Sequence, residues 1–173
     1  MKKWSIDPTH SEIGFKVKHM MFTNVKGNFN DYKANIELND DLKDAKLDFE
    51  ASINSIFTNN ADRDNHLKSA DFFDAEQFPT LNFKSTEIKG SGNDYEITGD
   101  LTIKGVTKPV KLAVEFGGIA TDPWGNTKVG LNLDGKINRK DFGLTYNAAL
   151  ETGGVLVGED VKLNAEIQLV EQK

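Results

Sequence analysis

The sequence predicts an all-β protein whose antiparallel strands cover their own apolar face, and three observations lead to this fold class. Apolar and polar residues alternate with a period of two along most of the chain. Short Gly- and Pro-containing stretches separate the alternating segments, and one segment alone has the signals of a helix. A period of two is typical of a strand with one dry face and one wet face. The length of 173 residues suits a single domain spanning residues 1–173.

The alternation recurs in enough segments to predict at least eight strands. The alternating segments are 13–17, 32–38, 47–53, 81–83, 95–98, 101–103, 110–116, 129–137 and 161–169. The predicted hairpin turns are GSGN at 90–93, GVTKP at 105–109 with Pro109 at a strand mouth, and DPWGN at 122–126. The Gly-rich stretch 151–160 predicts another hairpin connection, with Gly153 and Gly154 at positive φ. Short connections and one-sided strands favour an antiparallel sheet, because parallel strands are apolar on both faces.

One segment, about residues 60–70, is predicted to form a short helix. Asn59 or Asn60 can cap its N-terminus, and Asp62 and Asp64 lie in its first turn, beside the positive end of the helix dipole. A single short helix cannot cover the dry faces of so many strands, so the sheet must cover itself as a sandwich or as a closed barrel. An eight-stranded barrel has a lumen that either fills with side chains or holds one small ligand, and both outcomes remain open.

Composition excludes several classes of function. The chain has no cysteine, which excludes a disulfide framework, a thiolate nucleophile and a Cys-based metal site. The net charge of −6 argues against a nucleic-acid partner. No apolar leader follows the N-terminal lysines and no stretch is long enough to span a membrane. We therefore expect a cytoplasmic protein, or a periplasmic or secreted one only if a leader has been removed.

Few polar side chains are candidates for chemistry. His10 and His19, with Asp7 or Glu12, are the candidates for a metal site, but no HxH or HxxxH pair is present, so we expect no metal. No GxSxG motif is present, and we expect no catalytic residue and no cofactor. The DFG within RKDFG (139–143) lacks the other kinase elements and is expected to lie in a β-hairpin.

The RDNH stretch places Arg63 and His66 on one face of the predicted helix, with Asp64 pointing elsewhere. Two interpretations stay open. In one, the helix is solvated and Arg63 pairs with a neighbouring carboxylate. In the other, Arg63 and His66 form a polar gate at one end of the barrel, where the head group of a ligand accepts hydrogen bonds.

Five stretches of sequence carry a resemblance to a known family. They are WSIDPTHSEIGFKVKHMM, VKGNF, NSIFTNNADRDNHLKSADFFDAEQFPTLNFKS, YEITGDLTIKGVTKPVKL and INRKDFGL, in this order over nearly the whole chain. With them the sequence closely resembles the YceI-like family of lipocalin-like, polyisoprenoid-binding proteins. The resemblance implies an extended, eight-stranded antiparallel lipocalin-like barrel with a small helical cap. It also implies a homodimer and a lumen that holds a long isoprenoid chain, such as a polyprenyl quinone or polyprenyl phosphate.

The resemblance and the strand parity together predict the ligand-binding residues. The polar candidates are Arg63 and His66 at the gate. The apolar candidates share the dry parity of their strands and are Phe15, Ile36, Phe49, Phe83, Tyr95, Ile97, Leu101, Phe116, Leu131 and Ile167. Parity does not separate the residues that line a tunnel from those that fill the core.

Three functions compete at this point. The preferred one is non-catalytic binding, for transport or storage, of an isoprenoid lipid, which predicts a continuous apolar tunnel. The alternative is a plugged barrel that acts as a dimeric interaction or stress-related module, which predicts a lumen filled by side chains. The third is a His-dependent enzyme acting on a lipid, which predicts titratable groups that converge in a pocket.

Overall fold

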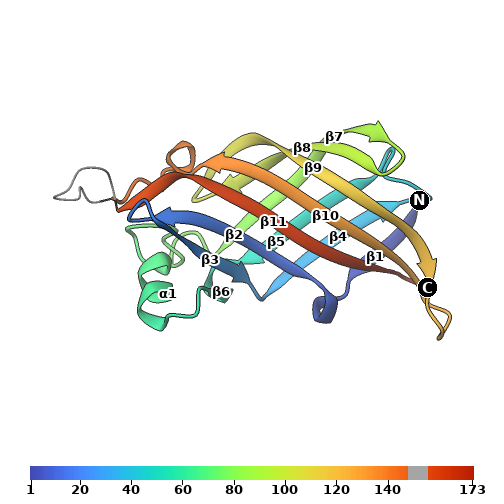
Figure 1. The fold of residues 1–173 in the computed structure, drawn as a ribbon, viewed down its shortest axis with the longest axis horizontal. Helices are drawn as coiled ribbons and strands as arrows, with labels where there is room; N and C mark the ends of the chain where they lie inside the picture. Colours follow the sequence, from blue (N-terminus) through green and yellow to red (C-terminus); the bar gives the residue numbers. More distant parts are fainter. Residues whose placement is uncertain (148–155) are drawn as a thin grey trace.

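Eight antiparallel strands close into a barrel, which confirms the predicted fold class and excludes the sandwich. The computed structural model describes residues 1–147 and 156–173. Around the ring, each strand pairs with the next, and β1 pairs with both β4 and β11 to close it (Figure 1). The strands of the ring are β1 (Lys2–Ile6), β4 (Tyr32–Leu38), β5 (Lys46–Ser52), β7 (Thr80–Ser91), β8 (Asp94–Ile103), β9 (Val106–Thr121), β10 (Thr127–Asn138) and β11 (Val157–Glu171).

Three further strands extend the barrel along the first half of β11. They are β2 (Glu12–His19), β3 (Thr23–Phe29) and β6 (Ile56–Phe57). β1 pairs with the C-terminal end of β11, at Leu169–Glu171, whereas β2 pairs with it from Val157 to Glu166. The 3-10 turn η1 (Pro8–His10) joins β1 to β2. The barrel wall therefore changes neighbours halfway along its length.

β3 was not predicted from the sequence. Its residues, TNVKGNF, include only two large apolar side chains, Val25 and Phe29. The inward position between them is Gly27, which lies opposite Phe15 of β2. A Cβ atom at Gly27 would lie 2.5 Å from the Phe15 ring, so the ring of the neighbouring strand occupies the space of the missing side chain. The inward face of β3 is therefore filled partly by its own side chains and partly by Phe15 of β2, so β3 alone lacks the full alternation of apolar residues.

The predicted helix is confirmed as α1 (Ala61–Lys68). Asn60 is its N-cap, and the Asn60 side chain accepts a hydrogen bond from the backbone N–H of Arg63. Asp62 and Asp64 lie in the first turn, as expected. The helix lies at one end of the barrel, and both chain termini lie at the other end (Figure 1).

Four local predictions need correction or fall outside the described residues. Pro109 lies inside β9 rather than at its mouth, and it is tolerated because β10 pairs with β9 only from Ala113 onward. The RKDFG stretch forms a 3-10 turn, η3 (Arg139–Phe142), and not a hairpin. Part of 151–160 belongs to β11, which begins at Val157. Gly153 and Gly154 lie outside the described residues.

The inward side chains form two clusters at opposite ends of the barrel. The first, which we call the solid half, surrounds Trp4 and contains fully buried Leu38, Ile97 and Leu169. The second, which we call the hollow half, lies near α1 and η3 and contains Phe29, Ile137 and Phe142. Within residues 1–147 and 156–173, no helix is long and apolar enough to cross a membrane.

Candidate functional site

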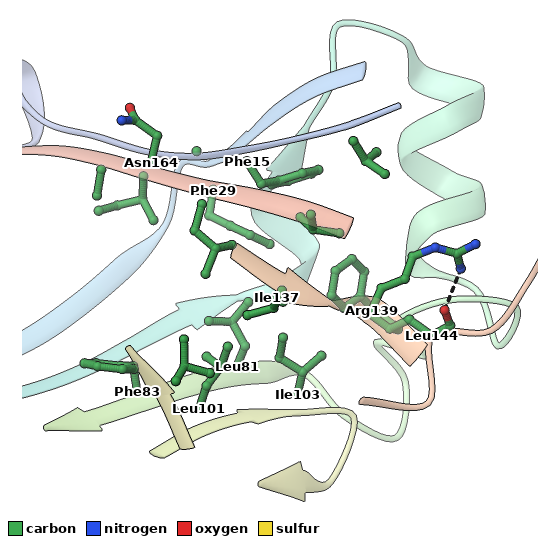
Figure 2. Close-up of a pocket in the computed structure, with 18 of the residues that line it drawn as sticks. Phe15, Phe29, Leu81, Phe83, Leu101, Ile103, Ile137, Arg139, Leu144 and Asn164 are labelled. Carbon is green, nitrogen blue, oxygen red and sulfur yellow. Dashed lines mark hydrogen bonds between the residues drawn. The ribbon is translucent and has the colours of Figure 1, made fainter. Parts of the chain in front are cut away.

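The hollow half encloses a cavity of about 490 Å³. Its wall is formed by side chains from all the strands of the ring and from β2 and β3, and α1 and η3 contribute residues at one end. Figure 2 shows Phe83 and Leu101 pointing into this space from neighbouring strands. The volume lies within the range of about 300–1,000 Å³ that is typical of small-molecule sites.

The wall contains buried apolar side chains, such as Leu101 and Ile137, and others that neighbouring side chains cover only in part. Val161, Leu163, Ala165 and Ile167 of β11 all line the cavity and are half-buried, although they face inward. Leu169 has the same parity on the same strand and is 0% exposed, because it lies in the solid half. The half-burial of inward apolar residues is therefore the signature of the empty lumen.

Two phenylalanines of the wall lie flat over glycines of neighbouring strands. The ring of Phe15 covers Gly27, and the ring of Phe83 covers Gly99, where an added Cβ would lie 2.4 Å from a ring carbon. A larger residue at either glycine would push the ring toward the lumen. The two glycines thus leave room for the rings of Phe15 and Phe83 against the barrel wall, so that these rings take up less of the cavity.

Most of the predicted ligand-binding residues lie on the cavity wall. The residues placed there are Phe15, Ile36, Phe49, Phe83, Leu101, Ile167, Arg63 and His66. Four others do not line the cavity, namely Tyr95, Ile97, Phe116 and Leu131. These four fill the solid half, where the rings of Tyr95 and Phe116 meet edge to face at 6.2 Å. Parity placed them inward correctly, but their position along the barrel puts them beyond the end of the cavity.

Arg63 is held by Thr58, and the ion pair of the first interpretation is not formed with any carboxylate of the described residues. Its Nε donates to Thr58 Oγ1 at 2.8 Å and its Nη2 donates to the Thr58 carbonyl oxygen. Asp64, which is buried, accepts hydrogen bonds from the N–H and the hydroxyl of the same threonine. The network ties α1 to the segment after β6 and holds Arg63 at the cavity.

His66 belongs to an aromatic cluster at the helix end of the cavity. Its ring meets Phe72 and Tyr146 edge to face, with centroids 5.0 Å and 4.8 Å apart. Its Nε2 lies 2.8 Å from Asp71 Oδ2. The ring is therefore fixed from three sides. Phe72 and Tyr146, which also line the cavity, were not predicted as site residues.

Arg139 is a further cavity residue that sequence reasoning missed. It is 3% exposed, and it forms no ion pair within 4 Å in the part of the chain that the structure describes. Its guanidinium donates to the carbonyl oxygens of Leu144, Val157 and Gly158, as Figure 2 shows for Leu144. Burial lowers its pKa, and the charge of Glu159 opposes that shift. The only available signal was its position in the RKDFG stretch.

The two histidines considered for a metal site lie in different surroundings. His10 Nδ1 is 2.9 Å from Asp7 Oδ2 at the β1–β2 junction, whereas His19 lines the cavity at the far end of β2. They are separated by the whole length of β2. Among the described residues, no group of three or more potential metal ligands converges.

An eight-stranded antiparallel barrel with an apolar internal cavity defines a lipocalin-like ligand-binding architecture. The chain matches the YceI-like domain over residues 4–169, and it belongs to this family, as the sequence predicted. A UPF0312 protein of Staphylococcus epidermidis is 42% identical over 172 residues, which cover 97% of each chain.

Solved structures share the barrel. The YceI protein of Campylobacter jejuni is 38% identical, with a TM-score of 0.79 over 100% of both chains. A polyisoprenoid binding domain from Saccharophagus degradans has a TM-score of 0.72 over 99% of this chain and 100% of that chain. That domain is 12% identical, so the likeness shows the fold alone.

Proposed function

We propose that this protein binds a long isoprenoid lipid in its cavity, without catalysis, and transports or stores it. The observation that carries the proposal is the half-burial of the inward apolar side chains of β11, Val161, Leu163, Ala165 and Ile167, around a lumen that side chains do not fill. Such a surface gains about 25 cal/mol for each Å² that a hydrocarbon chain covers. Membership of the YceI-like family and the described ligand class of the Saccharophagus degradans domain support an isoprenoid as that chain.

The charged side chains of the lining favour a lipid with a polar, electron-rich head group. Lys18, Arg63 and Arg139 line the cavity with positive charge, against one acidic residue, Asp48. Guanidinium groups bind phosphate oxygens through parallel hydrogen bonds and can donate single hydrogen bonds to a carbonyl oxygen. We propose that the head group, of the polyprenyl phosphate or polyprenyl quinone type, lies beside Arg63 and His66 while the chain extends toward Ile36 and Ile167.

The other two functions are less well supported. A plugged barrel requires a lumen filled by side chains, and the cavity in the hollow half weighs against it. A His-dependent enzyme requires converging titratable groups, whereas His66 is held by Asp71 and two aromatic rings. The homodimer, the cytoplasmic location and the absence of a cofactor stay predictions.

The test is to fill the cavity and measure the lipid that the protein retains. Ala165 faces the lumen from β11, so Ala165→Phe puts a ring into the space that the chain would occupy. We expect the variant, purified from the native host, to carry roughly tenfold less extractable isoprenoid lipid, since overpacking costs about 1–3 kcal/mol. Native mass spectrometry before organic extraction measures the bound mass.

Ala113→Phe is the matched control, because Ala113 is exposed on β9. It makes the same change in composition outside the lumen and should leave the bound lipid unchanged. Equal lipid in Ala165→Phe and in the unmodified protein, or no isoprenoid in either, would overturn the proposal.

A further inference from the structure

The turn between β2 and β3 presents three large apolar side chains to solvent. Met20, Met21 and Phe22, which we call the β2–β3 tip, are 43%, 59% and 85% exposed. Exposed apolar residues that stand singly are common, but a contiguous group of large ones marks an interaction site. The tip lies at the same end of the barrel as α1 (Figure 1).

The backbone of the tip makes this choice of residues costly. Met20 and Met21 have φ of 50° and 65°, and the N–H of Phe22 donates to the carbonyl oxygen of His19. This is the geometry of a type I′ turn, in which Asn-Gly is strongly preferred at the two central positions. Methionine there costs conformational energy and exposes apolar surface, so neither folding nor solubility explains the sequence.

The tip adjoins one end of the cavity. Lys18 and His19, which precede the tip directly, both line the cavity, and so do Leu156 and Val157. The N–H of Met20 donates to the carbonyl oxygen of Leu156 at 2.8 Å. A surface that contacts the tip therefore also lies close to this end of the lumen.

A row of lysines crosses the outer face of the barrel behind the tip. In register, Lys26 of β3 lies opposite Lys16, Lys16 opposite Lys162, and Lys162 opposite Lys136. We call these four residues the basic row. Like charges directly opposite on neighbouring strands destabilise a sheet. Of the four, only Lys136 has an acidic partner within 4 Å, Asp160, in the described part of the chain.

Acidic residues form a second row farther from the tip. Glu12 lies opposite Glu166, Glu166 opposite Asn132, and Asn132 opposite Glu115. The basic row thus lies nearer the tip than this acidic row. Two further acidic residues, Glu159 and Asp160 at the start of β11, lie near the tip but are paired with Lys140 and Lys136. At about 3.3 Å per residue, the basic row lies about 13 Å behind the tip along β2.

From these observations we propose that the β2–β3 tip docks onto a membrane surface that contains anionic lipids. The apolar side chains of the tip enter the boundary between head groups and acyl chains, which amphipathic elements penetrate by about 5–10 Å. Lys18 and the basic row then lie level with or just outside the head groups, where each lysine is worth about a factor of five in affinity. The acidic row is held away from the membrane, which fixes the orientation with the tip end of the cavity toward the bilayer.

Docking itself does not depend on what the cavity holds. Its use for loading or releasing an isoprenoid rests on the proposed function. The two are separable by experiment, because docking can be measured on vesicles that contain no isoprenoid, and retained lipid can be measured without vesicles.

The experiment measures co-sedimentation of the full chain with vesicles of equal parts phosphatidylcholine and phosphatidylglycerol, and with vesicles of phosphatidylcholine alone. A tip variant, Met20→Asn with Met21→Gly and Phe22→Thr, supplies the turn sequence that the backbone favours, so it should fold at least as stably. We expect it to bind the anionic vesicles at least tenfold more weakly. Lys16→Gln with Lys26→Gln should weaken binding roughly 30-fold, and added salt should weaken the unmodified protein likewise.

Matched controls come from the opposite end and the opposite wall. Trp124 is 82% exposed in the β9–β10 turn, at the end that holds the termini, so Trp124→Ser removes an equally exposed apolar residue from the wrong place. Lys84→Gln with Lys108→Gln removes two exposed lysines from β7 and β9. Both controls should bind like the unmodified protein.

Three results would overturn the proposal. The unmodified protein could fail to sediment with anionic vesicles, or the controls could lose as much binding as the tip and lysine variants. Sedimentation velocity could instead show that the tip variant dissociates a dimer while vesicles bind none of the proteins, in which case the tip contacts a second copy of this chain. If the unmodified protein binds the anionic vesicles but retains no isoprenoid lipid, only the proposed function is contradicted.

Discussion

The solid and hollow halves of the barrel share one pattern of alternation but differ in what their inward side chains meet. In the solid half, Trp4 fills the lumen, and its indole N–H donates to the carbonyl oxygen of Leu38 at 3.2 Å. In the hollow half, the wall is widened by β2 and β3 and by glycines beneath Phe15 and Phe83. One end supplies stability through packing, and the other leaves apolar surface uncovered for a ligand.

The sharpest comparison of the two halves uses two leucines of one strand. Leu169 and Leu163 lie on β11 with the same parity, and Leu169 is fully buried whereas Leu163 is half-buried. Leu169→Ala should lower the free energy of unfolding by about 3–5 kcal/mol, since it opens a cavity in close-packed surroundings. Leu163→Ala should cost about 1 kcal/mol in the lipid-free protein, because its methyl groups already face empty space.

Chemical denaturation of lipid-free protein measures both changes. Equal losses would mean that the hollow half is as closely packed as the solid half, and the division between them would fail. Lipid-loaded protein gives a second readout, in which the cost of Leu163→Ala should rise because the ligand covers that side chain.

Arg139 in the hollow half, like Trp4 in the solid half, is a large buried side chain that donates hydrogen bonds to backbone carbonyl oxygens. Its guanidinium joins the carbonyl oxygens of Leu144, Val157 and Gly158, so it holds the η3 region against the start of β11. Arg139→Lys keeps the charge but cannot bond to all three with the same geometry, and should cost about 2–3 kcal/mol in unfolding free energy. Lys140→Gln next to it is the control, since Lys140 is exposed and, within residues 1–147 and 156–173, forms an ion pair with Glu159 alone.

Hydrogen exchange would locate the effect of Arg139→Lys. We expect faster exchange of the backbone amides at the start of β11 and unchanged exchange around Trp4. Faster exchange at both ends would contradict a local role and indicate that the barrel opens as one unit.

Alternation was sufficient to predict an antiparallel sheet that covers its own apolar face, and the family resemblance selected the barrel. Neither divided the barrel into a solid half and a hollow half. Strand parity correctly placed Tyr95, Ile97 and Leu131 inward, yet nothing local distinguishes them from Phe49 or Leu163. The difference depends on distance along the barrel axis, which is set by long-range pairings such as Trp4 with Ile36 and Val161 with Val17. A one-dimensional pattern contains no information about that distance.

The polar end of the site was predictable only where a local element carried it. Arg63 and His66 share a face of a helix whose cap was recognised, so their common position at the cavity followed. Arg139 and Tyr146 reach the same end from η3 and the segment after it, and their approach depends on the closure of the whole sheet. Asp64 was expected to point away from the face that Arg63 and His66 share. Its burial against Thr58 could not be predicted, because it depends on where β6 places Thr58 in the fold.

The smallest expected effect lies at the junction of the two halves, where β1 ends and β2 begins. The carboxylate of Asp7 accepts hydrogen bonds from the N–H and hydroxyl of Thr9 and lies 2.9 Å from His10 Nδ1. These contacts, with the Thr9 hydroxyl first, lower the pKa of Asp7 to about 2. A folded-state pKa below the usual 3.8 means that the contribution is complete above about pH 4 and is lost as the pH falls toward 2.

Asp7→Asn should therefore lower the free energy of unfolding by about 1 kcal/mol near neutral pH, less than the whole shift implies, because partial exposure screens the charge. At pH 2, where Asp7 is about half protonated, most of the difference between the variant and the unmodified protein should be gone, and the pH dependence between 4 and 2 should be shallower in the variant. Denaturation at both pH values measures this, with Asp94→Asn on an exposed strand end as the control.

Tyr32 gives a second readout. Burial raises the pKa of Tyr32 most, and the charge of Asp7 raises it further, so the variant should lower that pKa in a spectroscopic titration. If Asp7→Asn lowers the free energy of unfolding by the same amount at pH 2 as at neutral pH, the ionised carboxylate is not what stabilises the junction.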